Sequence, residues 1–225
     1  QDEDPEEKQQ ENDKTAARIM KNFENETEWD PANLNGMGLE ILGDSKTIIN
    51  WMRGLWSVTN KEYGDLVAKT HNLMSMLSSW GLEAPKSGQD LFKHFYREGN
   101  ARADKLSWEA RLGPARKYWF PYQHALSGYH KTALRGAFDG GVSNEGSGGG
   151  WWLQLGVQYY HHHHHFEWFD VCEEAFGLSP QSSVTECELT ACYRLACAAA
   201  EVAASQLFTG LSLIHISEPT RLNPI

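Results

Sequence analysis

The chain has 225 residues, of which 40% are hydrophobic and 12% aromatic, so it is long and apolar enough for one or two folded domains. Its formal net charge of −10 argues against a protein that binds nucleic acid through a large basic surface. Much of this charge lies in residues 1–30, which contain 11 acidic and 4 basic side chains. The rest of the chain is close to neutral, so the charge weakens a nucleic-acid-binding function without excluding it.

Apolar runs and cysteine usage indicate the compartment. The most apolar stretch, 189–208, contains Arg194 and Glu201, which favours an amphipathic helix over a membrane span. The four cysteines follow neither a metal-binding spacing nor a disulfide framework. We therefore expect a reduced, intracellular protein, nuclear or cytoplasmic, that is not secreted, does not contact a membrane and has no obligate protein partner.

The first part of the chain divides into an acidic linker and a folded segment. Residues 1–33 are poor in apolar side chains and are expected to be disordered, because they bury too little surface to offset the entropy of ordering. The segment 34–112 has the spacing of a βααβα unit, in which Ser45 and Asn100 are expected to cap the helices that follow them. Its predicted strands are 39–44 and 90–96, and its predicted helices are 46–53, 61–80 and 101–112.

An aromatic, proline-containing linker, 113–130, leads to a second folded segment, 131–210, with the predicted order βββα. Glycines crowd the stretch 140–150, which predicts a glycine-rich turn and a hairpin around it. Thr185 is the expected N-cap of the helix. The predicted strands are 132–139, 151–160 and part of 161–178, and the predicted helix is 184–208.

Five consecutive histidines, 161–165, lie between two of these predicted strands. Five adjacent imidazoles can bind Zn²⁺ or Ni²⁺ adventitiously, but side chains that alternate along a strand point to opposite faces of the sheet, so we do not expect a designed metal site there. We interpret the run as low-complexity variation.

Four short acidic motifs carry the functional information in the chain. They are Gly43-Asp44-Ser45, Asn100-Ala101-Arg102-Ala103-Asp104, Phe138-Asp139-Gly140-Gly141 and Glu186-Cys187-Glu188-Leu189. Each resembles one of the four carboxylate motifs of the ribonuclease H family, in particular its plant and retroelement members. That family carries the motifs in the order Asp-Gly, Glu-Leu, Asp-Ser, Ala-Asp, whereas the last two come first in this chain.

The swapped order leaves two domain organisations open. The chain resembles the C-terminal half of a ribonuclease H-like domain, 34–112, followed by the N-terminal half, 131–210. It is either a fragment spanning two tandem domains or a permuted domain whose halves pack together. The resemblance implies an α/β fold with a mixed five-stranded sheet flanked by helices. We expect the isolated chain to adopt the permuted assembly, because each half alone leaves a bare sheet edge and a bare apolar face.

The resemblance also implies a chemistry. Asp139, Glu188, Asp44 and Asp104 occupy the positions of the family's metal ligands and are expected to converge on two Mg²⁺ or Mn²⁺ ions. Hard divalent cations prefer carboxylate oxygens, and two of them about 4 Å apart activate a water and stabilise the leaving oxygen of a phosphodiester. His94, in a segment that resembles the plant and retroelement versions, is expected to assist proton transfer or product departure.

The implied activity is hydrolysis of the RNA strand of an RNA–DNA hybrid. The alternative is an inactive fragment or relict of a retroelement polyprotein that acts at most as a nucleic-acid-binding module. Further residues are expected to contact the hybrid: on the RNA strand through backbone and 2′-hydroxyl contacts, in the minor groove, and on the DNA strand. In that order they are Gly140, Ser143 and Asn144; Thr185; and Trp56 and Asn60.

The end of the sequence is treated separately. Residues 211–221 resemble the conceptual translation of a sequencing-library adapter. We therefore expect 211–225 to be an artefact whose deletion leaves folding and activity unchanged; the alternative is a natural hydrophobic tail.

Overall fold

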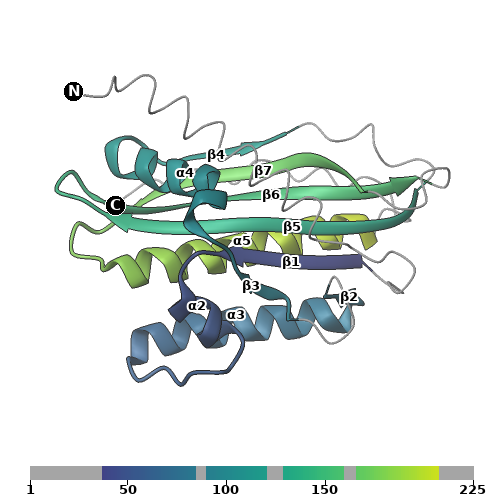
Figure 1. Cartoon of the computed structure of the whole chain (residues 1–225), viewed down its shortest axis with the longest axis horizontal. Coiled ribbons are helices and arrows are strands. Elements are labelled where there is room, and N and C mark those ends of the chain that lie inside the picture. The colour runs from purple at the N-terminus through teal and green to yellow at the C-terminus, as the bar shows by residue number, and fades with distance from the viewer. Residues whose placement is uncertain (1–36, 85–89, 121–128, 160–165, 208–225) are drawn as a thin grey trace, which may run out of the picture.

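The computed structural model describes residues 37–84, 90–120, 129–159 and 166–207. The expectations for the acidic linker 1–33, the histidine run 161–165 and the tail 211–225 lie outside these residues. The chain forms a mixed α/β fold, in which helices flank one sheet of parallel and antiparallel strands (Figure 1). In chain order the elements are β1 (Met37–Gly43), α2 (Lys46–Met52), α3 (Lys61–Ser79), β2 (Leu82–Glu83), β3 (Phe92–His94), a 3₁₀ turn η2 (Arg97–Gly99), α4 (Ala101–Leu112), β4 (Arg116–Trp119), β5 (Tyr129–Val142), β6 (Ser147–Tyr159), β7 (Glu167–Leu178) and α5 (Val184–Leu207).

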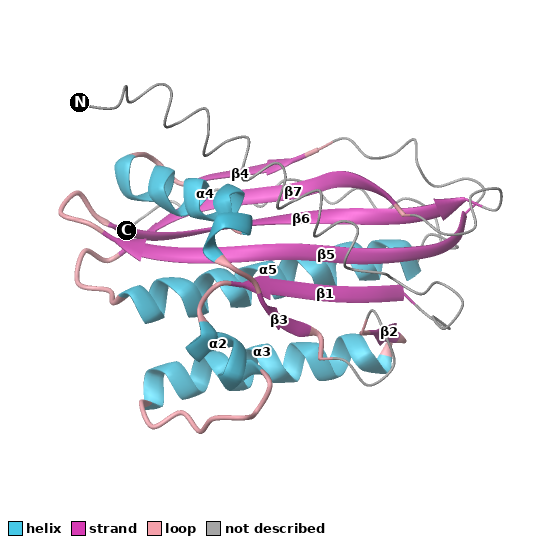
Figure 2. Ribbon diagram, viewed as in Figure 1, coloured by secondary structure: helices cyan, strands magenta, loops and turns pink. Residues whose placement is uncertain are grey.

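The sheet has seven strands in the order β2-β1-β5-β6-β7-β4, with β3 also paired to β1 (Figure 2). Three long antiparallel strands, β5, β6 and β7, form its centre, and β1 lies parallel to β5. Strands from both sequence segments therefore belong to one sheet. The β1–β5 register runs from Gly38 opposite Ala133 to Gly43 opposite Phe138.

The prediction of five strands was wrong because two short strands were not anticipated. β2 has two residues and pairs with β1, and β4 pairs with β7 at the other edge of the sheet. β4 lies within the predicted linker 113–130, and all four of its residues are exposed. A strand at a sheet edge that buries neither face has no alternating pattern of apolar side chains from which it can be predicted.

The helices cover opposite faces of the sheet. A methyl group added at Gly149 would meet Ala191 and Cys187 of α5, whereas one added at the adjacent Gly150 would meet Leu106 and Ser107 of α4. Successive residues of a strand point to opposite faces, so α4 covers one face and α5 the other. α2 and α3 pack on the α5 side, where α3 contacts α5.

The glycine-rich stretch 140–150 is mostly strand, not turn, which corrects the prediction. The hairpin turn comprises residues 143–146 and is closed by a hydrogen bond from the Ser143 amide to the Gly146 carbonyl, at 2.8 Å. The other glycines lie in β5 and β6. They leave space for helices on both faces: a Cβ at Gly150 would be 2.4 Å from Leu106 Cβ, and one at Gly140 would be 2.2 Å from the Glu188 amide nitrogen.

The two largest apolar clusters hold the layers together. The larger lies between the sheet and helices α2, α3 and α5, and includes Leu39, Ile49, Phe138, Trp151 and Leu195. The smaller lies under α4 and includes Leu42, Phe95, Ala103, Leu106 and Trp152. Among the described helices, none has both the length and the apolarity to cross a bilayer.

The predicted helices are confirmed to within two residues at each end. The predicted helix caps are not confirmed as capping hydrogen bonds. Ser45 and Asn100 stand at the N-cap positions of α2 and α4 but form no capping hydrogen bond with their side chains. In α5 the Ser183 hydroxyl accepts a hydrogen bond from the Glu186 amide at 3.1 Å, so Ser183, not Thr185, caps this helix.

Candidate metal centre

Three of the four predicted ligands meet where β1 ends beside β5. Asp44 directly follows Gly43, the last residue of β1, and Gly43 is opposite Phe138. The next residue of β5 is Asp139, so the two aspartates lie side by side at the end of the shorter strand. Glu188 comes from the first turns of α5, whose backbone packs against Gly140. One carboxylate oxygen from each of Asp44, Asp139 and Glu188 lies within 4.8 Å of the other two.

Asp104 and His94 are near this cluster but not part of it. Asp104 is in the first turn of α4, and its half-exposed carboxylate is 3.4 Å from the Arg97 guanidinium. Its charge nevertheless contributes to raising the pKa of Asp139. His94 ends β3, and its Nε2 is 3.1 Å from the backbone carbonyl oxygen of Asp44. The imidazole therefore lies next to the cluster, and its role in proton transfer stays a prediction.

Hydrogen bonds from α4 and its N-terminus orient two of the carboxylates. The Ser107 hydroxyl donates to Asp139 Oδ2 at 2.6 Å, and both groups are buried. The Asn100 amide donates to Asp44 Oδ1 at 3.3 Å and to the Phe138 carbonyl at 2.9 Å. Asn100 thereby joins the two strands that carry the aspartates.

Sequence reasoning missed these supporting roles. Asn100 and Ser45 were predicted as helix caps, yet Asn100 holds Asp44, and Ser45 forms a hydrogen bond with Glu188. Ser107 was not singled out at all. The available signal was its position one helical turn after Asp104, which places both side chains on the same side of α4.

Burial and mutual repulsion perturb the acids. Desolvation, with smaller contributions from the charges of Asp44 and Asp104, raises the pKa of Asp139 to about 6, although the hydrogen bond from Ser107 opposes the shift. Desolvation, followed by the charges of Asp139 and Asp44, raises the pKa of Glu188 to about 7, against the hydrogen bond from Ser45. None of these three carboxylates forms an ion pair with a described arginine or lysine.

This donor set fits a hard divalent cation. Three carboxylate oxygens in a partly buried site are the ligands that Mg²⁺ and Mn²⁺ prefer. A bound cation would favour the charged carboxylates, which desolvation and, to a lesser extent, mutual repulsion penalise. A cluster with raised pKa values at the end of a strand also has the electrostatic character of a functional site.

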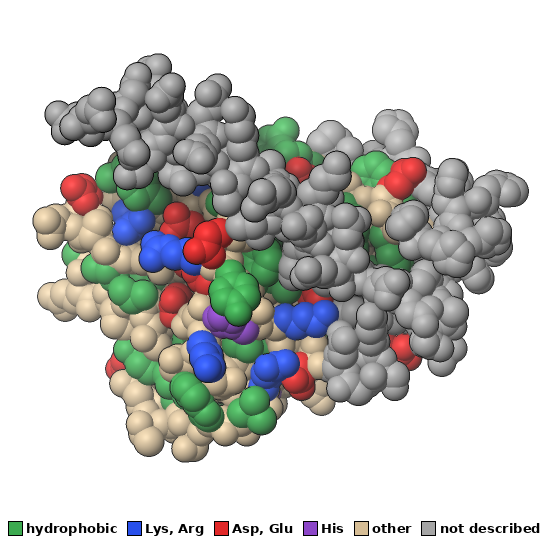
Figure 3. All heavy atoms as spheres, in the orientation of Figure 1, with side chains coloured by type: hydrophobic (Ala, Val, Ile, Leu, Met, Phe, Trp, Pro, Cys, Tyr) green, Lys and Arg blue, Asp and Glu red, His purple; other side chains and the backbone are tan. Residues whose placement is uncertain are grey.

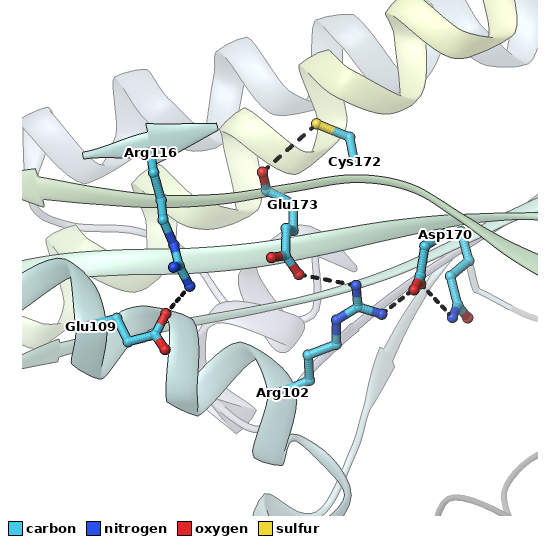
Figure 4. A network of polar contacts seen from close by, with 7 residues as sticks. Arg102, Glu109, Arg116, Asp170, Cys172 and Glu173 are labelled. Atoms are coloured by element: carbon cyan, nitrogen blue, oxygen red, sulfur yellow. Dashed lines mark hydrogen bonds and ion pairs between the residues drawn. The ribbon is translucent and has the colours of Figure 1, made fainter. Parts of the chain in front are cut away.

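Helix α4, which carries Asp104 and Ser107, is fixed to the sheet by a polar network (Figure 4). Arg102 donates to Asp170 Oδ1 at 2.6 Å and to Glu173 Oε2 at 3.0 Å, both on β7. Near the other end of the helix, Glu109 forms an ion pair with Arg116 of β4. Two anchors on one rigid helix define where the Ser107 hydroxyl meets Asp139.

The residues predicted to hold an RNA strand lie along one end of the β5–β6 hairpin. Gly140 is buried, and its α-carbon faces the backbone of α5, so its observed role is close packing. Ser143 and Asn144 are in the hairpin turn, where Asn144 is exposed and the Ser143 hydroxyl accepts a hydrogen bond from the Glu145 amide at 3.3 Å.

The other predicted contact residues are dispersed. Thr185 is in the first turn of α5 and half-buried. Trp56 and Asn60 belong to the loop between α2 and α3. Trp56 is 50% exposed, whereas Asn60 is the N-cap of α3 and accepts a hydrogen bond from the Tyr63 amide at 3.2 Å. Asn60 thus has a structural role that was not predicted.

No protein-family model, curated protein or solved structure matches the chain. The function is therefore argued from the geometry of the carboxylate cluster and from the motifs that supply it.

Replacing Ser107 by alanine is expected to weaken Mn²⁺ binding about tenfold, because the hydroxyl both orients the Asp139 carboxylate and favours its charged form. Losing a group that supports a metal ligand typically costs 10- to 100-fold in affinity. Titration calorimetry of the purified protein with Mn²⁺ measures the effect. Ser79→Ala, at the exposed end of α3, is the control; equal affinities in the two variants would show that Ser107 does not support the site.

Proposed function

We propose that the protein is a metal-dependent endonuclease with a ribonuclease H-like domain, and that it hydrolyses the RNA strand of RNA–DNA hybrids by two-metal-ion catalysis. The observation that carries this proposal is the convergence of Asp44, Asp139 and Glu188. These three acids were singled out by their motifs, they come from three different elements, and they meet within 4.8 Å.

The order of the elements supports the ribonuclease H-like assignment. Starting at β5, the chain runs β5, β6, β7 and α5, and the N-terminal segment supplies β1, α2, α3, β3 and α4. Apart from the short strands β2 and β4, this is the βββαβααβα order that the resemblance implies. Asp139 lies in a long strand, Glu188 on the helix that follows the third strand, and Asp44 at the end of the neighbouring parallel strand. Asp104 is in the first turn of a helix, as the resemblance requires.

Asp44, Asp139 and Glu188 would hold the cations, with Asp104 at the edge of the site. When bound, Mg²⁺ or Mn²⁺ ions supply an activated water and neutralise charge on the phosphodiester. The described residues do the positioning: Ser107 and Asn100 orient the two aspartates, and α4 is held in place by Arg102 and Glu109. His94, whose Nε2 is 3.1 Å from the Asp44 carbonyl oxygen, would assist proton transfer or product departure.

Cleavage of end-labelled substrates tests the proposal. We expect Mg²⁺- or Mn²⁺-dependent cuts in the RNA strand of a hybrid, no cuts in EDTA, and little action on a DNA duplex, which lacks the 2′-hydroxyl groups. Asp139→Asn is expected to reduce the rate by more than about 100-fold, since it removes a ligand itself and not only an outer partner.

Two other outcomes would contradict the proposal. Equal rates for the native protein and Asp139→Asn, or cleavage that persists in EDTA, would exclude a mechanism in which the carboxylates hold metal ions. Binding of the hybrid without cleavage under any metal would instead favour the alternative of a nucleic-acid-binding relict.

A further inference from the structure

Arg111, an arginine beside the carboxylate cluster, differs from most other described arginines in having no carboxylate partner. The structure describes seven arginines. At least five of them form ion pairs with carboxylates, and Arg135, among other contacts, donates to Gln154 and lies over the ring of Trp168. Arg111, on the last turn of α4, forms no ion pair with any described residue. The five ion pairs are Arg53–Asp90, Arg97–Asp104, Arg102–Asp170, Arg116–Glu109 and Arg194–Glu174.

Arg111 is nevertheless held in a defined place. Its guanidinium lies against the backbone of Gly141, where an added Cβ would be 3.2 Å from both Cζ and Nη1. Its contact with an acceptor is weak, because Nη1 is 3.5 Å from the Val142 carbonyl oxygen. Its Nε is buried and has no hydrogen-bond acceptor. A buried, charged donor without an acceptor costs free energy. The contacts of Arg111 within the folded chain therefore do not account for the position of its guanidinium.

The guanidinium of Arg111 lies next to the candidate metal centre. Gly141 is two residues after Asp139 on β5, so both point to the α4 face. Arg111 is one turn after Ser107, which contacts Asp139. The guanidinium therefore lies between the cluster and the hairpin turn 143–146. Glu145 in that turn is fully exposed; the hydrogen bond involving Ser143, and to a lesser extent the charge of Arg111, lower its pKa.

The surroundings favour an anionic ligand. The cluster itself is acidic and the chain carries a net charge of −10, so a polyanionic substrate needs local cations to be held near it. Figure 3 shows basic side chains interspersed with acidic ones on one face of the molecule, not gathered into a continuous basic patch. A guanidinium has a planar set of donors that matches the oxygens of a phosphate.

We propose that Arg111 binds a backbone phosphate of the nucleic-acid strand that is cut, close to the phosphodiester at the carboxylate cluster. The inference rests on the proposed function and assigns Arg111 as its substrate-positioning residue. Two residues along β5 correspond to about 6.6 Å, which places Arg111 beside the cleaved linkage and not at it. The phosphate would accept hydrogen bonds from the terminal nitrogens of the guanidinium, since Nε itself is buried.

The salt dependence of hybrid binding tests this assignment without requiring cleavage. The parent is the full chain carrying Asp139→Asn, and the probe is a fluorescent RNA–DNA hybrid titrated at several NaCl concentrations in EDTA. Each phosphate contact contributes about 0.9 to the slope of log K against log salt. Arg111→Gln is expected to lower the slope by about 1 and to weaken binding, whereas Arg111→Lys, which keeps the charge, is expected to retain the slope.

Arg194→Gln is the matched control, because Arg194 lies on α5 and is paired with Glu174; its slope is expected to equal that of the parent. Thermal melts establish that each variant is folded. An unchanged slope in Arg111→Gln, or an equal fall in slope in the glutamine and lysine variants, would overturn the role of Arg111 and leave the nuclease proposal standing. Failure of the parent to bind the hybrid at any salt concentration would overturn the proposed function, and the assignment of Arg111 with it.

Discussion

Replacing Gly140 by alanine is expected to destabilise the protein by about 3 kcal/mol or more, the upper range for forcing atoms into a packed interior. The added Cβ would be 2.2 Å from the Glu188 amide nitrogen and 2.4 Å from the Cys187 carbonyl carbon. Both are backbone atoms of α5, so no side-chain rotation relieves the contact. α5 must move away from β5, and Glu188 must move away from Asp139.

Chemical denaturation of Gly140→Ala measures this loss, and Gly64→Ala provides the control. Gly64 is in the first turns of α3, and no atom lies within 4 Å of an added Cβ there. Alanine at that site is expected to raise stability by about 0.5 to 1 kcal/mol, because glycine is a poor helix former. A Gly140→Ala protein as stable as the native one would mean that β5 and α5 are not packed as closely as the structure shows.

Elements with a strong periodic pattern were predictable from the sequence. α3 and α5 have apolar side chains at helical spacing over 19 and 24 residues, and such long patterns exclude a strand. The centre of the sheet was also predictable, because β6 follows a turn and carries consecutive large apolar residues such as Trp151 and Leu153. Both of these are fully buried.

The predictions that were wrong concern residues whose conformation depends on contacts between distant parts of the chain. β4 owes its strand conformation to pairing with β7, from Arg116 opposite Ala175 to Trp119 opposite Cys172. The glycines of β6 suggested a turn because local conformational freedom is what glycine signals in a sequence. Their reason is the approach of α4 and α5 from opposite faces, which no local pattern encodes.

In the candidate site, too, local motifs predict some features and contacts between distant residues determine the others. Motifs identified Asp44, Asp139 and Glu188, but only the pairing of β1 with β5 and the packing of α5 on Gly140 bring them together. The supporting role of Asn100 is missed because an asparagine at a helix start is most simply explained as a cap. That of Ser107 is missed because a serine within a helix is most simply explained as a solvent-exposed residue. Their hydrogen bonds span 32 and 56 residues of sequence.

Replacing Asp139 by asparagine is expected to stabilise the metal-free protein at pH 8 by about 3 kcal/mol. Folding raises the pKa of Asp139 from 3.8 to about 6, so the folded state binds the proton more tightly than the unfolded state. Below about pH 4 both states are protonated and the carboxyl has no effect on stability. Between pH 4 and 6 the unfolded state loses its proton first, so stability falls as the pH rises, by about 1.4 kcal/mol for each pKa unit, and stays low above pH 6.

Asparagine keeps the shape of the side chain and an acceptor for the Ser107 hydroxyl, but it removes the charge that burial penalises. Thermal melts in EDTA from pH 4 to 8 measure the effect, and the variant should show a flatter profile than the native protein. The flattening is partial, because Glu188, with a pKa raised to about 7, remains.

Metal addition should reverse the ranking. A cation that binds only the folded state stabilises it by RT ln(1 + [L]/Kd), so Mn²⁺ is expected to raise the melting temperature of the native protein and not that of Asp139→Asn.

Asp170→Asn is a comparison variant for which the expected change in stability has the opposite sign. The Arg102 guanidinium lowers the pKa of Asp170 against the opposing desolvation, so removing this charge should destabilise the protein at pH 8. If Asp139→Asn instead melts below the native protein in EDTA at pH 8, the Asp139 carboxylate stabilises the fold. It would then not be a metal ligand that lowers the stability of the metal-free protein.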